Sequence, residues 1–228
     1  MDEIASIENG LKVIAVNYMM YQYRPDGRDV DRDRDLSTLL ASAVWSSKRE
    51  NLNDPFEFAA LLEENAFPDV VARATNAGIT CFCRAKTNPL LWSHYANAHK
   101  GFAIGWDMSH AFFGRIAGMG HSLIHDVLYE DVPPDPKSFG DGGSYLMAAL
   151  TTKSTAWAYE QEVRLIADEG GRPQLLPKEA IKQVLFGMSM PAQRMEEIRS
   201  RVVAAGISAE FARMTPRPGN YCVVPAPL

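Results

Sequence analysis

Hydrophobic residues in this chain gather in short blocks, separated by polar segments and by segments that contain glycine or proline. Several blocks are rich in β-branched and aromatic residues, which is typical of buried strands. Residues 162–167 (EVRLIA) instead alternate polar and apolar side chains, as in a strand with one buried face. We predict strands at 13–23 (one or two strands), 44–47, 79–83, 102–106, 123–129, 162–167, 184–186 and 207–212.

Helix signals lie between these blocks. Asn53-Asp54-Pro55 and Asn88-Pro89 each combine a capping residue with a proline that suits the first helical turn. The predicted helices cover 36–43, a segment that opens at Pro55, 90–99, 144–157 and 191–205. Strands and helices do not alternate regularly, so the pattern favours an α+β fold with short mixed or antiparallel strands over a doubly wound sheet.

Three segments read as loops or surface chain. Residues 24–35 hold four arginines and five aspartates, which predicts a charged loop, either simply solvated or acting as a lid beside a cleft. Residues 130–143 contain three prolines and three glycines and predict a long loop. The tail at 214–228 is too rich in proline for a central strand and is expected on the surface. With no repeat and no low-complexity linker, we expect a single domain over 1–228.

Composition narrows the class of protein. Apolar residues make up 46% and charged residues 22% of the chain, which are values of globular proteins. The net charge of −5 leaves only a local basic groove as a site for nucleic acid. Three cysteines without C-x-x-C spacing exclude a zinc ribbon and suggest a reducing compartment. No apolar run reaches the ~20 residues of a membrane span, and the acidic N-terminus has no signal-peptide core, so we expect a cytoplasmic protein without membrane contact.

The segment Trp92-Ser93-His94-Tyr95, followed by His99, is the most unusual local sequence. Five residues separate the two histidines, which places them about 140° apart around a helix and not on one metal-binding face. His121 and His125 have a suitable spacing but lack the glutamate of a zinc signature. We therefore expect histidines that pack or cap helices, and no metal.

A second cluster joins Lys153 to Glu160, Glu162 and Arg164. If the two glutamates lie on one strand, they share a face, and their repulsion raises the pKa of one carboxyl, as proton transfer requires. The alternative is an exposed pair neutralised by Lys153 and Arg164, and the strand pattern alone favours it. No glycine-rich phosphate loop and no G-x-S-x-G motif occurs.

Spaced motifs in this chain resemble a large, mostly bacterial family catalogued as domain of unknown function 2971. They occur in the family's order from about residue 18 to 190, and the family implies no function. The motifs are Tyr21-Gln22-Tyr23-Arg24, Asn53-Asp54-Pro55-Phe56-Glu57, Cys81-Phe82, Trp92-x-His94-Tyr95-Ala96-x-x-His99-x-Gly101-Phe102, Val127-x-Tyr129 and Lys153-x-x-x-Trp157-x-Tyr159-Glu160-x-Glu162-x-Arg164.

More distantly, the chain is similar to the ADP-ribosyltransferase fold, which has a split sheet. That fold carries a basic residue on its first core strand, a serine or tyrosine on the next and a late glutamate in an E-x-E string. Arg24, Ser46-Ser47 and Glu160-Gln161-Glu162 follow this order. The charged insert after Arg24 departs from the pattern, and so does the lack of a Ser-Thr-Ser string.

The second resemblance implies NAD as substrate and assigns the catalytic roles. Glu162 stabilises positive charge on the ribose as the nicotinamide bond breaks, and Glu160 orients or deprotonates the acceptor. Arg24 binds the phosphates of NAD, and Ser47 is the serine of the triad. The expected cofactor-binding residues are Arg24, Tyr23, Ser46, Tyr95, His94 and Trp92, although Trp92 suits core packing equally well.

These assignments lead to an NAD-dependent ADP-ribosyltransferase-like enzyme that modifies a nucleic acid or a protein, or hydrolyses NAD. Its setting would be bacterial toxin, phage-defence or stress biology, with a neutralising partner in the toxin case. Two alternatives stay open. One is a non-catalytic regulatory module that uses the aromatic-histidine segment and the charged loop to bind a partner. The other is a hydrolase or nuclease that uses His94 or His99.

Overall fold

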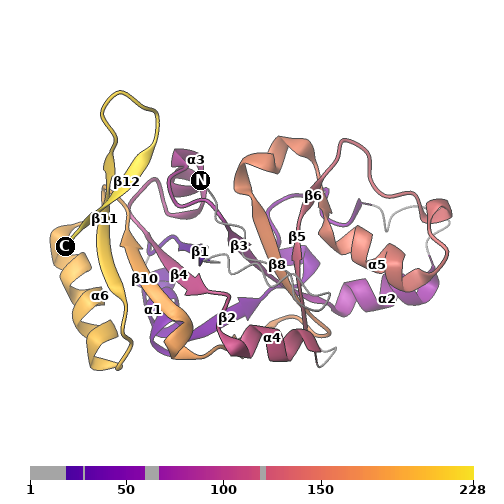
Figure 1. Ribbon diagram of the computed structural model, residues 1–228, viewed down its shortest axis with the longest axis horizontal. Helices are drawn as coiled ribbons and strands as arrows, with labels where there is room; N and C mark the ends of the chain where they lie inside the picture. Colours follow the sequence, from indigo (N-terminus) through magenta and orange to yellow (C-terminus); the bar gives the residue numbers. More distant parts are fainter. Residues whose placement is uncertain (1–18, 28, 60–66, 119–121) are drawn as a thin grey trace, which may run out of the picture.

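The computed structural model describes residues 19–27, 29–59, 67–118 and 122–228. Within these residues, eight strands form one mixed sheet in the order β12-β11-β10-β4-β1-β3-β8-β5, and Figure 1 shows it running through the molecule. The strands are β1 (Met19–Arg24), β3 (Gly78–Cys83), β4 (Phe102–Asp107), β5 (Ser122–Asp126), β8 (Glu162–Ala167), β10 (Ile181–Phe186), β11 (Glu210–Pro216) and β12 (Val223–Pro227).

The pairing is weakest at the middle of this sheet. β1 pairs with β4 along its whole length, from Met19 opposite Asp107 to Arg24 opposite Phe102. Across the described residues, β1 pairs with β3 only where Tyr21 lies opposite Cys83. The β1 side and the β3 side therefore diverge from a single point of contact.

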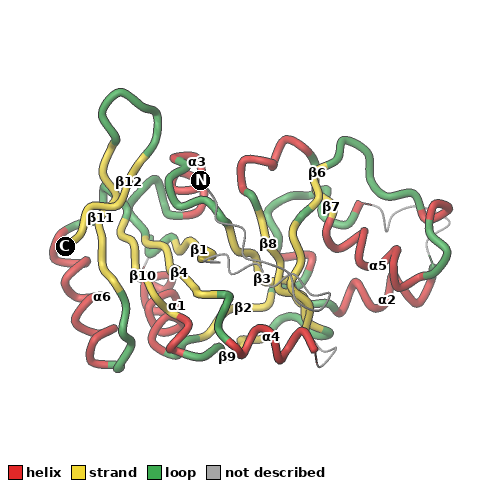
Figure 2. The backbone as a smooth tube through the Cα atoms, viewed as in Figure 1, coloured by secondary structure: helices red, strands yellow, loops and turns green. Residues whose placement is uncertain are grey.

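Two smaller pairs stand beside the main sheet, as Figure 2 shows. β2 (Ala43–Ser46) pairs with β9 (Arg172–Leu175), and β6 (Leu128–Tyr129) pairs with β7 (Thr152–Lys153). Together with the helices they confirm the α+β prediction. Neighbouring strands in the described part of the main sheet are antiparallel, except for the parallel β10–β11 pair.

The helices cover the two sides of the sheet and its ends. The α-helices are α1 (Asp29–Leu40), α2 (Pro68–Asn76), α3 (Pro89–Tyr95), α4 (Ala111–Gly118), α5 (Gly142–Thr151) and α6 (Ala192–Ala204). Short 3₁₀ turns occur at η1 (Arg49–Asn51), η3 (Pro136–Ser138), η4 (Thr155–Glu160) and η5 (Lys178–Ala180). α2 and α5 pack together on the β3–β8 side, whereas α1 and α6 lie on the β1–β10 side (Figure 1).

The charged segment 24–35 is not the loop that its composition predicts, because α1 begins at Asp29. Leu36 and Leu39 on the same helix are 1% and 0% exposed and pack in the main core. Burial of this apolar face outweighs the weak helical tendency of a mixed-charge sequence. The predicted helix at 36–43 is thus the end of a longer one.

The prediction of a surface tail at 214–228 also needs correction. β12 is a strand, and it pairs with β11 at the edge of the sheet. Pro225 and Pro227 lack an N–H for a second neighbour, which is tolerated only at an edge. The proline content therefore excluded a central strand but not an outermost one.

Other boundaries shift by a few residues. The helix predicted at 90–99 stops at Tyr95, and Asn97, Ala98 and His99 follow with positive φ angles. The helix predicted at 144–157 gives way at Thr152 to β7 and then η4. The predicted 130–143 loop is interrupted by the short η3 turn. The predicted strand at 13–18 and residues 60–66 of the segment opening at Pro55 lie outside the described residues.

Candidate functional site

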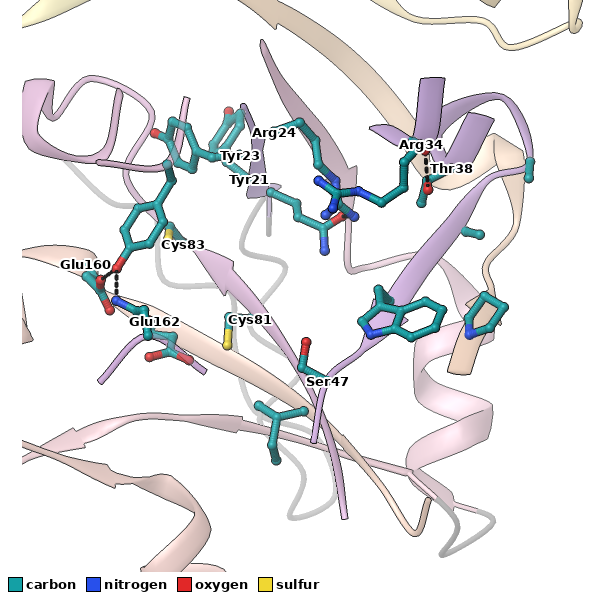
Figure 3. Close-up of a pocket in the computed structure, with 18 of the residues that line it drawn as sticks. Tyr21, Tyr23, Arg24, Arg34, Thr38, Ser47, Cys81, Cys83, Glu160 and Glu162 are labelled. Carbon is teal, nitrogen blue, oxygen red and sulfur yellow. Dashed lines mark hydrogen bonds between the residues drawn. The ribbon is translucent and has the colours of Figure 1, made fainter. Parts of the chain in front are cut away.

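A pocket of about 800 Å³ opens where β1 and β3 diverge. Tyr21 and Cys83, the one pair that joins these strands in the described part of the chain, both line it. Its walls come from β1, α1, β2, β3, α3, β7, β9 and the η4–β8 segment. Figure 3 shows Glu160 and Glu162 at one side of this space, and Arg24, Arg34 and Thr38 at another.

Six of the residues expected in a site line this pocket. They come from sequence positions as far apart as β1 and β8, so the fold alone brings them together. These residues are Tyr23, Arg24, Ser47, Tyr95, Glu160 and Glu162.

The carboxylate side of the pocket is a buried ionic network. Lys153 Nζ lies 2.7 Å from Glu160 Oε2 and 3.2 Å from Glu162 Oε2. Arg164 donates from Nε to Glu162 Oε1 at 2.8 Å and from Nη2 to Glu57 Oε1 at 2.7 Å. Each of these side chains is at most 4% exposed, so two cations hold three carboxylates away from water.

This network sets the ionisation of Glu162. Burial raises the pKa of its carboxyl, but the charges and hydrogen bonds of Arg164 and then Lys153 outweigh burial and lower the pKa to about 2. The pKa of Lys153 is raised, because the carboxylates outweigh the effect of its burial. The rise in pKa expected for one of the two carboxyls therefore does not occur at Glu162.

The two glutamates do not share a strand face as predicted. β8 begins at Glu162, while Glu160 ends η4, and Gln161 between them has a left-handed φ of 48°. This turn in the backbone still directs both carboxylates to Lys153. The pair is neutralised by Lys153 and Arg164 as the alternative interpretation proposed, but it is buried rather than exposed.

Tyr95 links α3 to this network. Its hydroxyl donates to Glu160 Oε1 and accepts from Asn53 Nδ2 at 2.9 Å. Burial and the hydrogen bond to Glu160 raise the pKa of the Tyr95 hydroxyl, so it stays a neutral donor. Glu160 is thereby held by one hydroxyl and one ammonium group.

Arg24 is the last residue of β1 and lies at the side of the pocket away from the glutamates (Figure 3). Its Nη2 donates to Gln22 Oε1 at 2.9 Å, and its buried Nε has no hydrogen-bond partner among the described residues. Burial lowers the pKa of Arg24, and nearby Asp35 counteracts this effect. An arginine with an unsatisfied buried donor beside a cavity can accept an anionic ligand.

The structure separates Ser47 from Ser46. Successive residues of a strand point to opposite faces, and Ser47 lines the pocket whereas Ser46 does not. Ser46 is 0% exposed, and its hydroxyl accepts from Gln174 Nε2 at 3.2 Å. Ser46 therefore has a packing position in this structure.

Trp92 and His94 also lie outside the residues that line the pocket. Trp92 is 0% exposed and donates from Nε1 to the Lys86 carbonyl at 2.8 Å, which places it in the core. His94 is exposed, and its ring lies 6.2 Å from that of Tyr159. α3 directs Tyr95, and neither of these two, into the pocket.

Sequence reasoning missed two contributors. Glu57 joins the network through Arg164, and Asn53 holds Tyr95. Both stand in the Asn53–Glu57 motif that carries the family resemblance, and that motif was the available signal. Cys81 and Cys83 line the pocket too, and burial raises the pKa of both thiols, which makes them neutral wall residues.

Comparisons with known proteins concern one third of the chain. Residues 91–165 match the model of a family described as protein of unknown function (DUF2971). This match supports the resemblance to that family, and it contains Tyr95, Lys153, Glu160 and Glu162. No curated protein and no solved structure matches the chain, so the likeness to ADP-ribosyltransferases is not confirmed.

In the described ranges, no group of three or more histidine, cysteine, aspartate or glutamate side chains is arranged to hold a metal ion. No helix in the same ranges has the length and apolar character of a membrane span.

Proposed function

We propose that the pocket binds NAD and that the protein is an ADP-ribosyltransferase-like enzyme, which transfers ADP-ribose to a macromolecule or to water. One observation carries the proposal. Arg24 on β1 is far in sequence from Glu160 at the end of η4 and Glu162 at the start of β8, yet all three line one pocket of about 800 Å³. That volume lies within the roughly 300–1,000 Å³ of small-molecule sites.

The reaction breaks the bond between nicotinamide and C1′ of the ribose. The electron pair of this bond leaves with the nicotinamide nitrogen, and positive charge develops on the ribose. An acceptor hydroxyl then forms a bond to C1′ and loses its proton. A fixed anion beside C1′ stabilises this transition state more than the ground state, which is the requirement for catalysis.

Glu162 suits the role of that anion. With a pKa of about 2 it is ionised at neutral pH, and Arg164 and Lys153 fix its position. The same property makes it a poor proton acceptor. We assign proton removal or acceptor positioning to Glu160, whose carboxylate is held by Tyr95 and Lys153.

Arg24 supplies a positive charge for the phosphates of NAD. Its buried Nε, which has no hydrogen-bond partner among the described residues, favours a phosphate oxygen, and the carboxylate side would repel phosphates. NAD carries an anionic pyrophosphate and a ribose that becomes cationic, so this distribution of charge fits a single orientation of the dinucleotide. Ser47, which also lines the pocket, is assigned to the ribose hydroxyls.

A non-catalytic binding module is the second candidate. The observation that favours it is that both carboxylate oxygens of Glu162 already bind the cationic groups of Lys153 and Arg164. In that case the network holds the pocket in shape, and the protein would bind a nucleotide without turnover. The acceptor, a neutralising partner and a cytoplasmic toxin or defence setting belong to the first proposal.

The deciding experiment incubates the purified chain with NAD and measures nicotinamide release, alone and with RNA, DNA or cell extract. We expect release by the wild type and a decrease of roughly a hundred- to thousandfold for Glu162→Gln, the range found when one transition-state contact is removed. Release at the same rate by wild type and variant, or no release in any condition, would contradict the enzymatic proposal.

Glu57→Gln is the matched control. Glu57 bonds to the same Arg164, and its side chain is as buried as that of Glu162, but it does not line the described pocket. Both substitutions remove one carboxylate from the network, so both lower thermal stability. Nicotinamide release by folded Glu57→Gln should remain well above that of Glu162→Gln. Equal losses would make stability, and not catalysis, the cause.

A further inference from the structure

One wall of the pocket is a single chain segment that runs from α1 through a turn into β2. Arg34, Ser37 and Thr38 lie on one face of α1, Ala41 follows the helix directly, and all four line the pocket. Trp45 on β2 continues the same wall. Leu36 and Leu39 of α1 are buried in the core, which fixes the opposite face of the helix.

Trp45 presents an aromatic surface to this pocket. It is 47% exposed, whereas Trp92 and Trp106 are 0% exposed. The fourth tryptophan, Trp157, lies with its ring 4.7 Å from Lys153 Nζ and does not line the pocket. A half-exposed tryptophan in a cavity leaves a large apolar face in water, which a planar ligand can cover.

The backbone around Trp45 is held rigidly. Across the β2–β9 pair Trp45 lies opposite Pro173, and its carbonyl accepts from Thr80 Oγ1 at 3.1 Å. Two residues on, Ser47 exchanges backbone hydrogen bonds with Ile79 of β3 at 2.8 and 2.7 Å. β2 is thus fixed to a strand on each side, so the indole needs little further ordering when it binds a ligand.

The distribution of charge in the pocket determines which part of a nucleotide lies against the α1–β2 wall. The carboxylates of Glu160 and Glu162 repel phosphate, so the phosphates must lie toward Arg24. Arg24, Arg34 and Thr38 are gathered away from the carboxylates in Figure 3. The base beyond the phosphates therefore extends to the α1–β2 wall.

We infer that Trp45 is the stacking platform for the adenine of the nucleotide, and that it makes the pocket selective for purine nucleotides. The inference rests on the proposed function for the orientation of NAD, with nicotinamide ribose at the glutamates. It adds a base-binding residue at the far wall. Binding of the adenylate half alone does not require catalysis.

The test measures dissociation constants of AMP, UMP and ribose 5-phosphate for the full chain by calorimetry. We expect AMP to bind more tightly than UMP, because a purine covers more of the indole. Trp45→Ala should weaken AMP binding by roughly 5- to 150-fold, the range for loss of one stacked base. Ribose 5-phosphate, which has no base, should bind wild type and variant equally.

Two further variants show whether a loss of AMP affinity in Trp45→Ala comes from misfolding. Trp45→Phe keeps an aromatic ring and should retain most of the AMP affinity. Leu175→Ala shortens an exposed side chain on β9, outside the residues that line the pocket, and should bind AMP like the wild type. AMP should also change the tryptophan fluorescence of the wild type, and this change should be absent in Trp45→Phe.

The outcomes separate this inference from the proposed function. Equal AMP affinity of wild type and Trp45→Ala, equal affinity for UMP and AMP, or an equal loss of ribose 5-phosphate binding would each overturn the role of Trp45. If AMP binding depends on Trp45 but NAD releases no nicotinamide, the stacking platform stands and the enzymatic proposal fails. If nicotinamide is released and Trp45→Ala still binds AMP normally, the enzymatic proposal stands and the stacking role of Trp45 fails.

Discussion

Glu162 shows how strongly single contacts determine the chemistry of this pocket. In isolation a buried carboxyl becomes a weaker acid, yet Arg164 and Lys153 reverse this effect and hold its pKa near 2. Removing one partner from such a network leaves the remaining charges buried and poorly matched, which costs more than an exposed ion pair contributes. The same residue thus connects stability with function.

The depressed pKa predicts a specific acid sensitivity. A carboxyl whose pKa falls from 4.5 in the unfolded chain to about 2 in the native state stabilises the fold above pH 4.5, and this contribution is lost as the pH falls toward 2. At pH 7 it amounts to about 3 kcal/mol. The difference in unfolding free energy between wild type and Glu162→Gln should therefore shrink by about 2 kcal/mol from pH 7 to pH 3.

Urea denaturation at the two pH values measures this difference. Glu196→Gln serves as the control, because Glu196 pairs with Arg199 at an exposed site and should change stability by less than about 1 kcal/mol at either pH. A Glu162→Gln effect that stays constant between pH 7 and pH 3 would show that the ionisation of Glu162 does not contribute to folding.

Single residues also show what a sequence reveals about a site. The neutralising partners Lys153 and Arg164 were predicted, because they stand close to the glutamates in the chain. Neither the burial of the network nor the part of Glu57 was predicted, since both depend on packing between distant segments. Ser46 and Ser47 could not be distinguished either, because only the register of β2 decides which hydroxyl reaches the pocket.

At the scale of elements, β1 and β4 position Arg24 through a close backbone contact. Gly101 precedes β4, and a Cβ atom there would overlap the carbonyl oxygen of Arg24 and would lie 2.9 Å from the carbonyl oxygen of Pro25. Only glycine allows the two chains to approach this closely. The position of the end of β1, and with it that of the Arg24 guanidinium, depends on this close approach.

We expect Gly101→Ala to lower the unfolding free energy by about 2–3 kcal/mol, the usual cost of forced overpacking, and to weaken NAD binding by displacing Arg24. Gly114→Ala is the matched control. It lies in α4 with no heavy atom near the added Cβ, so it should raise stability by up to about 1 kcal/mol and leave binding unchanged. Thermal denaturation and calorimetry measure both effects. An unaltered affinity in Gly101→Ala would show that this contact does not position Arg24.

Elements were predicted best where local pattern and packing agree. The strands 79–83, 102–106 and 162–167 were correct within a residue, and the apolar blocks of the first two are buried as the pattern requires. Residues 162–167 were expected to bury one face only, but both faces are buried, because Glu162 and Arg164 pair with each other in the ionic network. The first part of α1 (29–35) and β12 were missed since their sequences, rich in charge and in proline, have weak local preferences. In both cases long-range packing supplied the stability that the local sequence lacks.

At the scale of the whole molecule, the pocket is a consequence of how the sheet divides. The β4–β1 ladder and the β3–β8 ladder each pair over six residues, and in the described structure one pair joins them. In the described structure no ladder joins β1 to β3 beyond the Tyr21–Cys83 pair, and Ile79 of β3 bonds to Ser47 instead. The order of the predicted strands and helices favoured an α+β fold, and only the resemblance to ADP-ribosyltransferases implied a split sheet. The position of this gap depends on the divergence of two strands, which no local pattern reveals.

Hydrogen exchange should detect the divided sheet directly. We expect peptides from β1 and β3 to exchange faster than those from β4 and β8, because a ladder protects the latter strands on both sides. Saturating NAD should slow exchange in β1, β3 and α1, whose residues line the pocket, and leave the distant β11–β12 hairpin unchanged. At about 100 times the dissociation constant, NAD should also stabilise the fold by about 2.7 kcal/mol. Equal protection of β1 and β4 without ligand would contradict the open junction, and ligand-induced protection confined to β11–β12 would place the binding site elsewhere.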